Sequence, residues 1–393
     1  MRQAQVLMSV SRTLALAAAL CMASMRASDV LLPALSADFE VPIGEAGWAI
    51  SAFVLAYGIL QLVYGPLGDR FGKLRVIAVA LAASSVASIL AALAPTMTAL
   101  AIARGLSGAA AAGIVPMSMA RIGDTVPIER RQQALARLLL ATIGGLIGGQ
   151  WMSGLIADVL HWRVVFIVLA AGFGLVALRV RTKALGQEPE LPLRRSIGGQ
   201  VGEVLRQRWA RHILLVTVLE GLFTLSSFAL VPAYLHMEFG LSLGASGTVM
   251  AMYGIGGLVY VALSGMLTRH LSRGGLAGLG GLFLSSGFAI VAAGLRWEWS
   301  VLGCFLGGLG FYTLHNTLQT EATQMSPEAR GTAVGLFAAA LFFGQAIGMS
   351  LAAVVADSLG QTIWFCSAAL ALPILAFSFG RAVARRGLQD YDP

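Results

Sequence analysis

One short segment, Gly65-Pro66-Leu67-Gly68-Asp69-Arg70-Phe71-Gly72-Lys73-Leu74-Arg75, is charged and punctuated by glycine. Apolar runs flank it, from Gly44 to Tyr64 before it and from Val76 to Leu93 after it. Each run has about the length, roughly 20 residues, that a helix needs to cross a bilayer. We therefore expect a loop that joins two membrane spans. Its glycines allow close backbone approach, and its excess of basic residues marks the cytoplasmic side.

The composition of the whole chain agrees with a membrane protein. Its 393 residues are 57% hydrophobic and only 12% charged, and the mean hydropathy is +0.79. This exceeds what a soluble domain can bury. The net charge of +8 does not indicate a nucleic-acid partner, because the basic residues lie between apolar runs and no nucleic-acid motif is present. Cys21, Cys304 and Cys366 lie inside apolar runs, so we expect core residues and neither a disulfide framework nor a metal site.

Apolar runs of spanning length occur twelve times. The spans are predicted near Thr13–Leu35, Gly44–Tyr64, Val76–Leu93, Met97–Met119, Ala134–Ala157, Trp162–Val180, His212–Leu235, Gly244–Leu267, Gly274–Leu295, Ser300–Thr320, Gly331–Asp357 and Thr362–Phe379. An even number puts both termini on one side. Lys and Arg crowd the loops of that side, and the opposite loops hold little beyond Arg163 and Arg296, so we expect cytoplasmic termini and a multi-pass protein of the cell inner (plasma) membrane.

The longest polar segment divides the spans six and six. It predicts a six-helix bundle over residues 1–181, a cytoplasmic linker over 182–211 with a short surface helix near Val201–Arg208, and a second bundle over 212–393. Shifting the first half by 200 residues aligns several landmarks, namely Gly65 with Gly265, Gly144 with Gly344, and Gly148 with Gly348. This internal repetition indicates a duplicated unit, with the substrate site between the halves near the midplane.

Four ionisable residues lie inside apolar spans, where a charge costs on the order of 2.5–3.5 kcal/mol. Arg26 and Asp29 share one helix face and can pair locally. Asp29 is the candidate proton carrier, and the alternatives are a static ion pair or a solvated carboxylate near the outer surface. Glu220 is a candidate for binding a cationic substrate or a second proton, or for a plain hydrogen bond to a neighbouring helix. Arg104 is the fourth.

Polar residues recur at helical spacing on two further spans. Tyr312 and His315 belong to a stripe on span ten that is expected to face protein or water. His315 titrates near neutral pH and is a possible proton participant, although a lone histidine is more often a satisfied hydrogen-bonding group. On span two, Phe53, Tyr57 and Gln61 form a similar stripe, which fits either the cavity or helix packing.

These motifs resemble the major facilitator superfamily. The segment from Gly65 to Arg75 is similar to the signature between the family's helices 2 and 3, with Leu74 standing where a second adjacent basic residue is usual. Arg104-Gly105-Leu106-Ser107-Gly108 resembles the span-four signature of proton-coupled members. Gly144-Gly145-Leu146-Ile147-Gly148-Gly149 resembles the antiporter motif of the drug-efflux branch, with Gly145 in place of proline. Ser28 to Leu35 also looks like the first span of drug-efflux members.

The resemblance implies an all-α membrane fold of twelve helices in two pseudo-symmetric bundles. It suggests a relation between Asp29 and Arg104, and close helix packing at Gly144, Gly148 and Gly149. It also implies a gating latch that would place Asp69 near Gly331 and uses Gly65, Asp69, Arg70, Gly72, Lys73 and Arg130. The alternative role for these charges is to hold the loop inside the cell.

The function that follows is proton-coupled export of small organic molecules or drugs by alternating access. The alternative is a proton-coupled symporter or facilitator for a small metabolite. The expected partners are a small organic substrate, protons and the lipid bilayer, with no nucleic acid, and a monomer is the default of the family. An enzyme is not expected, because no nucleophile constellation is visible. No phosphate-binding loop occurs, and no cofactor is expected.

Overall fold

The computed structural model describes residues 2–184, 197–326 and 330–389. Within these ranges the chain is almost entirely helical and contains no strand. The elements are α1 (Arg2–Phe39), α2 (Ile43–Ala46), α3 (Trp48–Phe71), α4 (Lys73–Ala92), α5 (Met97–Ala111), α6 (Ile114–Thr125), α7 (Ile128–Val159), α8 (Trp162–Ala184), α9 (Ile197–Arg206), α10 (Arg208–Glu220), the π-helix η1 (Gly221–Leu225), α11 (Ser226–Phe239), α12 (Leu243–His270), α13 (Arg273–Ala293), α14 (Trp297–Ala322), α15 (Arg330–Leu359) and α16 (Gln361–Gln389).

The described helices account for the twelve predicted spans. Eleven segments are long and apolar enough to cross a membrane. The twelfth, α14, has 26 residues but is less apolar, because the predicted polar stripe with Tyr312 and His315 lies on it. This helix packs between α12 and α13, so protein rather than lipid surrounds much of it. Several spans consist of two consecutive elements, as α5 and α6 form one segment from Met97 to Thr125.

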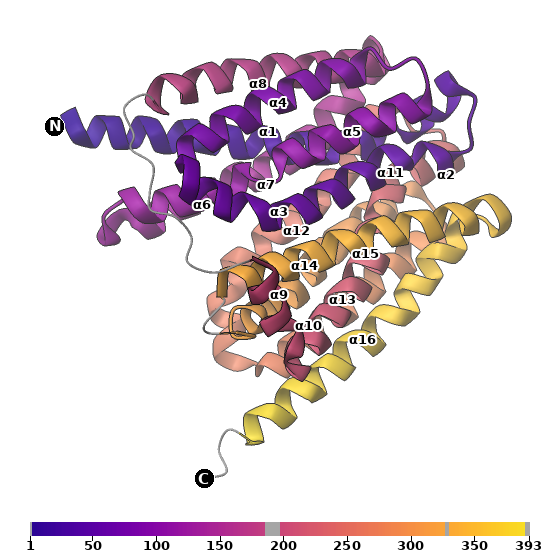
Figure 1. Cartoon of the computed structure of the whole chain (residues 1–393). Coiled ribbons are helices and arrows are strands. Elements are labelled where there is room, and N and C mark those ends of the chain that lie inside the picture. Colours follow the sequence, from indigo (N-terminus) through magenta and orange to yellow (C-terminus); the bar gives the residue numbers. More distant parts are fainter. Residues whose placement is uncertain (1, 185–196, 327–329, 390–393) are drawn as a thin grey trace.

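The helices pack in two groups, which Figure 1 shows above and below each other. In the first group α1 packs on α7, α4 on α8 and α3 on α5; in the second, α13 packs on α14 and α16, and α12 on α14. Two seams join the groups, α7 against α12 and α3 against α15. The first and last described residues lie at the end of the molecule opposite α2 (Figure 1). Most of the expected linker, residues 185–196, lies outside the described residues.

The segment predicted as a loop, Gly65 to Arg75, is mostly helix. α3 continues to Phe71 and α4 begins at Lys73, so that Gly72 alone breaks the helix, with a φ of +88°. A helix can leave the bilayer without unwinding because charged side chains solvate its last turns. Only glycine adopts this φ readily. The prediction of a turn was therefore correct at Gly72 and wrong for the residues before it.

The predicted latch is described only in part. Lys73 forms an ion pair with Asp124 at 2.6 Å, which ties the start of α4 to α6 within the first group. The guanidinium of Arg70 lies 5.1 Å from the ring centre of Phe71, and Gly65 has open space around its Cα. The side chains of Asp69 and Arg130 lie outside the described part of the structure. The gating role of this segment stays a prediction.

Glycines bring α7 into backbone contact with α1. Of the three glycines predicted to pack, Gly149 makes this contact and Gly144 and Gly148 do not, and Gly145 takes part although it was not predicted. A Cβ on Gly145 or Gly149 would lie 2.1 Å from the carbonyl oxygen of Ala19 or 2.4 Å from the Cα of Ala23. A Cβ on Gly144 or Gly148 would meet nothing within 4 Å. The correction follows from helix geometry, because residues four apart share a face and Gly144 and Gly148 lie on the neighbouring one.

The second group repeats this packing. A Cβ on Gly344 would lie 2.0 Å from the oxygen of Val218, and one on Gly348 would lie 2.1 Å from that of Leu222. These glycines match Gly145 and Gly149 at a spacing of 199 residues, not Gly144 and Gly148 at 200. The duplication read from the sequence is therefore visible as repeated contacts, with its register corrected by one residue in this helix pair.

Candidate functional site

A buried polar cluster lies where α1 meets α7. The Arg26 Nη1 is 3.3 Å from the Asp29 Oδ2, which forms the predicted local pair. The Gln150 Nε2 also donates to Asp29 Oδ2, at 3.3 Å. The side chains are buried, and Asp29 is 0% exposed. Asp29 Oδ1 and Gln150 Oε1 have no hydrogen-bond partner among the described residues. The carboxylate thus has one oxygen held by two donors and one oxygen available to a proton or a ligand.

Arg104 is not the direct partner of Asp29. Its Nη2 donates to the Ser24 carbonyl at 2.9 Å, its Nη1 contacts Ser24 Oγ at 3.4 Å, and its Nε donates to the Ala49 carbonyl at 3.3 Å. The guanidinium lies 4.2 Å from the ring centre of Phe53. The fork geometry of arginine suits such simultaneous contacts. Arg104 therefore fastens α5 to α1 and α3, and its effect on Asp29 is electrostatic at longer range.

A second buried carboxylate lies in the other group of helices. Glu220, at the end of α10, is 0% exposed, and its Oε2 is 3.0 Å from the Nδ1 of His315 on α14. Glu220 Oε1 has no hydrogen-bond partner in the described residues. The imidazole lies 4.9 Å from the Phe311 ring and 5.1 Å from that of Phe337. The contact is a hydrogen bond when the imidazole is neutral and an ion pair when it is protonated.

The chain immediately after Glu220 forms η1, the π-helix of residues Gly221–Leu225. Its first residue, Gly221, permits close approach of α15, because a Cβ there would lie 2.0 Å from the carbonyl oxygen of Leu341. The Ser226 hydroxyl donates to the Leu222 carbonyl and accepts from the Trp364 indole at 3.2 Å. Short π-helices in an α-helix are frequently found at functional sites. Here the irregular turn adjoins one of the buried carboxylates.

Aromatic side chains connect the two clusters. The rings of Tyr253 and Tyr312 lie 5.9 Å apart. Arg26 is close enough to both tyrosines to act on them electrostatically, and Glu220 also acts on Tyr253. Arg26 lies on α1 and the tyrosines lie on α12 and α14, so the site spans the two groups of helices. It combines charges of both signs with aromatic surface.

Tyr57, the remaining predicted site residue, packs at a seam. It is 2% exposed, and its ring stacks on Phe53 and meets the Phe342 ring edge-on at 5.1 Å. Phe342 lies on α15, so this contact crosses from one group to the other. Of the two interpretations of the span-two stripe, the structure therefore supports packing at this position.

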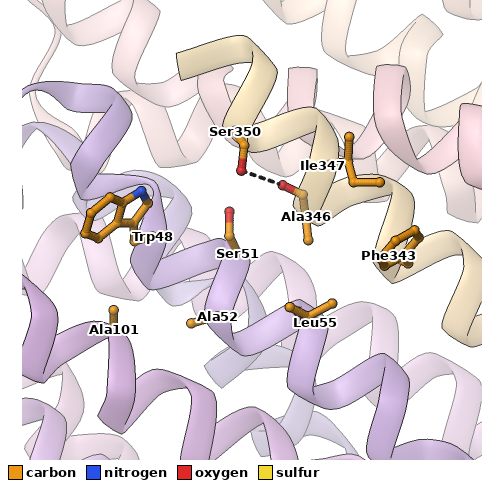
Figure 2. Close-up of a pocket in the computed structure, with 9 residues that line it drawn as sticks. All are labelled: Trp48, Ser51, Ala52, Leu55, Ala101, Phe343, Ala346, Ile347 and Ser350. Atoms are coloured by element: carbon orange, nitrogen blue, oxygen red, sulfur yellow. Dashed lines mark hydrogen bonds between the residues drawn. The ribbon is translucent and has the colours of Figure 1, made fainter. Parts of the chain in front are cut away.

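A pocket of about 400 Å³ lies farther along the same seam, between α3, α5 and α15. Figure 2 shows Trp48, Ser51 and Leu55 on one side of it and Phe343, Ile347 and Ser350 on the other. Its lining includes no ionisable residue. Trp48 is 47% and Phe343 is 49% exposed, so the pocket opens on the outer surface of the helices rather than on the buried charges. It is not part of the candidate site.

Sequence reasoning missed two residues of this site. Gln150 is a polar side chain in the apolar run of span five, and the test that selected Glu220 missed it because that test considered only ionisable residues. Tyr253 gave no such signal, because a tyrosine in a span is compatible with a lipid-facing, interfacial or buried position. The sequence predicted Glu220 and His315 as candidate residues but could not predict that they pair, because they lie 95 residues apart in the chain.

A sequence model of the Major Facilitator Superfamily matches residues 14–349. The chain belongs to this superfamily. It is therefore a multi-pass membrane protein of a transporter family, as the signature segment and the repeat predicted.

Relatives of this transporter include exporters. The uncharacterized MFS-type transporter YceJ of Bacillus subtilis (strain 168) is 26% identical over 342 residues, which are 84% of each chain. The multidrug export protein EmrB of Haemophilus influenzae is 30% identical over 159 residues, 40% of this chain and 31% of EmrB. The probable multidrug resistance protein EmrY of Escherichia coli (strain K12) is 28% identical over 192 residues, 48% of this chain and 37% of EmrY. These matches support the drug-efflux-like branch.

Solved structures agree on the fold. A bacterial homologue of the human lysosomal transporter Spinster, in an inward-facing and unoccupied conformation, has a TM-score of 0.74 and 16% identity, with 98% of both chains covered. The nucleoside transporter NupG has a TM-score of 0.77 and 15% identity, with 94% of this chain and 98% of NupG covered. At such identity the likeness concerns the arrangement of helices and not the substrate.

Proposed function

We propose that this transporter exports small organic molecules, drugs among them, in exchange for protons. The observation that carries the proposal is the pair of buried carboxylates, Asp29 and Glu220, one in each group of helices. Each has one oxygen bound to a donor and one oxygen without a partner among the described residues. The partial matches to EmrB and EmrY, named for multidrug export and resistance, support the choice of export.

Coupling between the two flows rests on competition between protons and substrate for these two carboxylates. Low dielectric disfavours a charged group, and a neighbouring cation favours a charged carboxylate. Burial favours the neutral form of Asp29, whereas Arg26 and Gln150 favour the charged form while they remain within reach, and movement of α7 relative to α1 would alter this balance. Glu220 depends in the same way on His315. A substrate that bears a positive charge or a hydrogen-bond donor can displace a proton from either carboxylate, which couples the two flows.

We further propose that the two groups of helices, residues 1–181 and 212–393 with the linker 182–211 between them, are the moving bodies. They would alternate access to the site by rocking about the two seams. We also propose that the end where the chain begins and ends faces the cytoplasm of a cell whose inner membrane holds the protein, and the excess of Lys and Arg at that end supports this orientation.

Proton movement in inverted membrane vesicles tests this proposal. Without an imposed pH gradient, adding an exported substrate outside should make the lumen more alkaline in wild type, because substrate enters as protons leave. A symporter would make the lumen more acidic under the same conditions, and a facilitator would not change its pH. The sign of the response therefore separates the proposed exchange from the alternative, uptake or passage of a metabolite.

Two variants test which carboxylate couples proton movement to substrate transport. We expect Asp29→Asn to reduce substrate-dependent proton release at least tenfold, and Glu220→Gln to do so if the second carboxylate also carries a proton. Arg163→Gln serves as the control, because its partner Asp38 lies at the end of α1, away from the buried carboxylates. Unchanged proton release in Asp29→Asn would show that the Arg26–Asp29 pair is a structural contact.

A further inference from the structure

The two groups of helices meet tightly at the end of the molecule near α2, which we call the closed end and define by Gly44, Asp158, Leu243 and Asp357. There, Asp158 near the end of α7 accepts two hydrogen bonds from the start of α12. Its Oδ1 is 2.9 Å from the Leu243 nitrogen, and its Oδ2 is 2.7 Å from the Gly244 nitrogen. One carboxylate thus binds the opposite group through backbone donors.

These two donors belong to the set that a helix cannot satisfy internally. The first N–H groups of an α-helix have no partner within it. Ser242 caps α12 in the ordinary way by accepting from Ala245 at 3.2 Å. Leu243 and Gly244 are left, and Asp158 takes both. The negative charge also lies at the positive end of the helix dipole. The beginning of α12 is therefore completed by a residue from the other group of helices.

Small residues make this contact close. A Cβ on Gly154, one turn before Asp158, would lie 2.4 Å from the carbonyl oxygen of Leu243. A Cβ on Gly247 would lie 2.7 Å from the carbonyl oxygen of Gln150. No side chain fills the space between the two backbones. Any movement that separates α7 from α12 must therefore break both hydrogen bonds of Asp158.

The second seam carries the same pattern at the closed end. A Cβ on Gly44 would lie 2.5 Å from the Cβ of Ala353 and 3.0 Å from Oδ2 of Asp357, and one on Gly47 would lie 3.1 Å from Cε of Met349. The two glycines match Gly244 and Gly247 at a spacing of 200 residues. Three residues of α15 match three of α7 at a spacing of 199, namely Met349 with Gln150, Ala353 with Gly154, and Asp357 with Asp158.

We propose that Asp158, supported by its repeat counterpart Asp357, is a clasp that holds the closed end shut. The clasp stabilises the conformation described here, and its release leaves two N–H groups of α12 without partners. The inference rests on the alternating access of the proposed function, and it depends on neither proton coupling nor substrate identity. Asp158 itself is exposed, and so is accessible to the medium at that end.

Distances between spin labels at the closed end test the clasp. Labels on Thr98→Cys and Glu298→Cys place one probe at the start of α5 and one at the start of α14. Cys366→Ser removes the exposed native cysteine, and the other two are buried. The full chain in lipid nanodiscs is measured by double electron–electron resonance, which reports the populations of short and long distances.

We expect Asp158→Ala to raise the ratio of long to short distances about two- to thirtyfold, the range of an N-cap substitution. Asp158→Asn retains one acceptor oxygen and should give a smaller rise. Asp38→Ala is the matched control. Asp38 is also a carboxylate near this end, but its partners Arg163 and Trp162 lie in its own group of helices. It should leave the ratio at the wild-type value.

A wedge variant separates the two ways in which the inference can fail. In Gly154→Leu the side chain must push α7 away from α12. A wild-type ratio in Asp158→Ala, with a raised ratio in Gly154→Leu, would overturn the clasp and leave alternating access standing. A wild-type ratio in both would overturn alternating access and the clasp together. An equal rise in Asp38→Ala would assign the effect to general loosening and would also overturn the clasp.

Discussion

Replacement of Arg104 by lysine should destabilise the fold more than it impairs coupling. The guanidinium makes three hydrogen bonds, to two atoms of Ser24 and to the Ala49 carbonyl, and lies 4.2 Å from the centre of the Phe53 ring. A lysine ammonium on a differently shaped side chain replaces one of these contacts and leaves the other acceptors buried. Each hydrogen bond to a charged group contributes roughly 1.5–3 kcal/mol. Two losses lower the free energy of unfolding by about 3–6 kcal/mol.

The assay is SDS-induced unfolding in mixed micelles, with proton release in inverted vesicles measured on the same preparations. Ser24→Ala is the graded control: it removes only the 3.4 Å contact, so the free energy of unfolding should fall by about 1.5 kcal/mol, the lower end of the range for one such hydrogen bond. Our reasoning is refuted if Arg104→Lys unfolds like wild type but no longer exchanges protons. Arg104 would then act chiefly as the counter-ion of Asp29, as the family resemblance suggested.

Two further outcomes follow from the packing and from the second carboxylate. Gly149→Leu should sharply reduce the yield of folded protein, because a Cβ has no room at position 149, whereas Gly144→Leu should express like wild type, because a Cβ meets open space at position 144. Size-exclusion profiles of the purified proteins measure the yield of folded protein, and equal yields for the two variants would contradict the prediction. His315→Gln keeps a hydrogen-bond donor for Glu220 but removes a side chain that can become a cation. Transport should persist with a flatter dependence on pH between about 5 and 8, and an unaltered profile would remove His315 from the mechanism.

The sequence was most informative where local physics determines the structure. Membrane spans follow from apolar length, because an unpaired backbone cannot remain in lipid. The pairing of Arg26 with Asp29 follows from their spacing of three residues on one helix. The doubled six-helix unit followed from repeated landmarks. These features need no knowledge of how distant segments meet.

The remainder depends on the rotation and register of helices that are far apart in the chain. Within six residues, four glycines offer two possible packing faces, Gly144 with Gly148 and Gly145 with Gly149, and only contact with α1 selects the second pair. Arg104 could reach a carboxylate or a carbonyl, and the helix packing gives it carbonyls. The clasp at Asp158 needs the start of α12 beside the end of α7, which no local pattern indicates.

The offset of 199 residues between equivalent helices puts the two buried carboxylates at different depths in the membrane. With a spacing of 199 residues, Asp29 corresponds to Phe228 and Glu220 to Cys21, so the two carboxylates lie eight residues apart along equivalent helices. At 1.5 Å per residue this is about 12 Å along the helix axis, or about two-fifths of a hydrocarbon core roughly 30 Å thick. A proton that leaves one carboxylate and reaches the other crosses that share of the membrane voltage, worth about 0.9 kcal/mol per 100 mV. The membrane potential, and not the pH difference alone, therefore drives such a step.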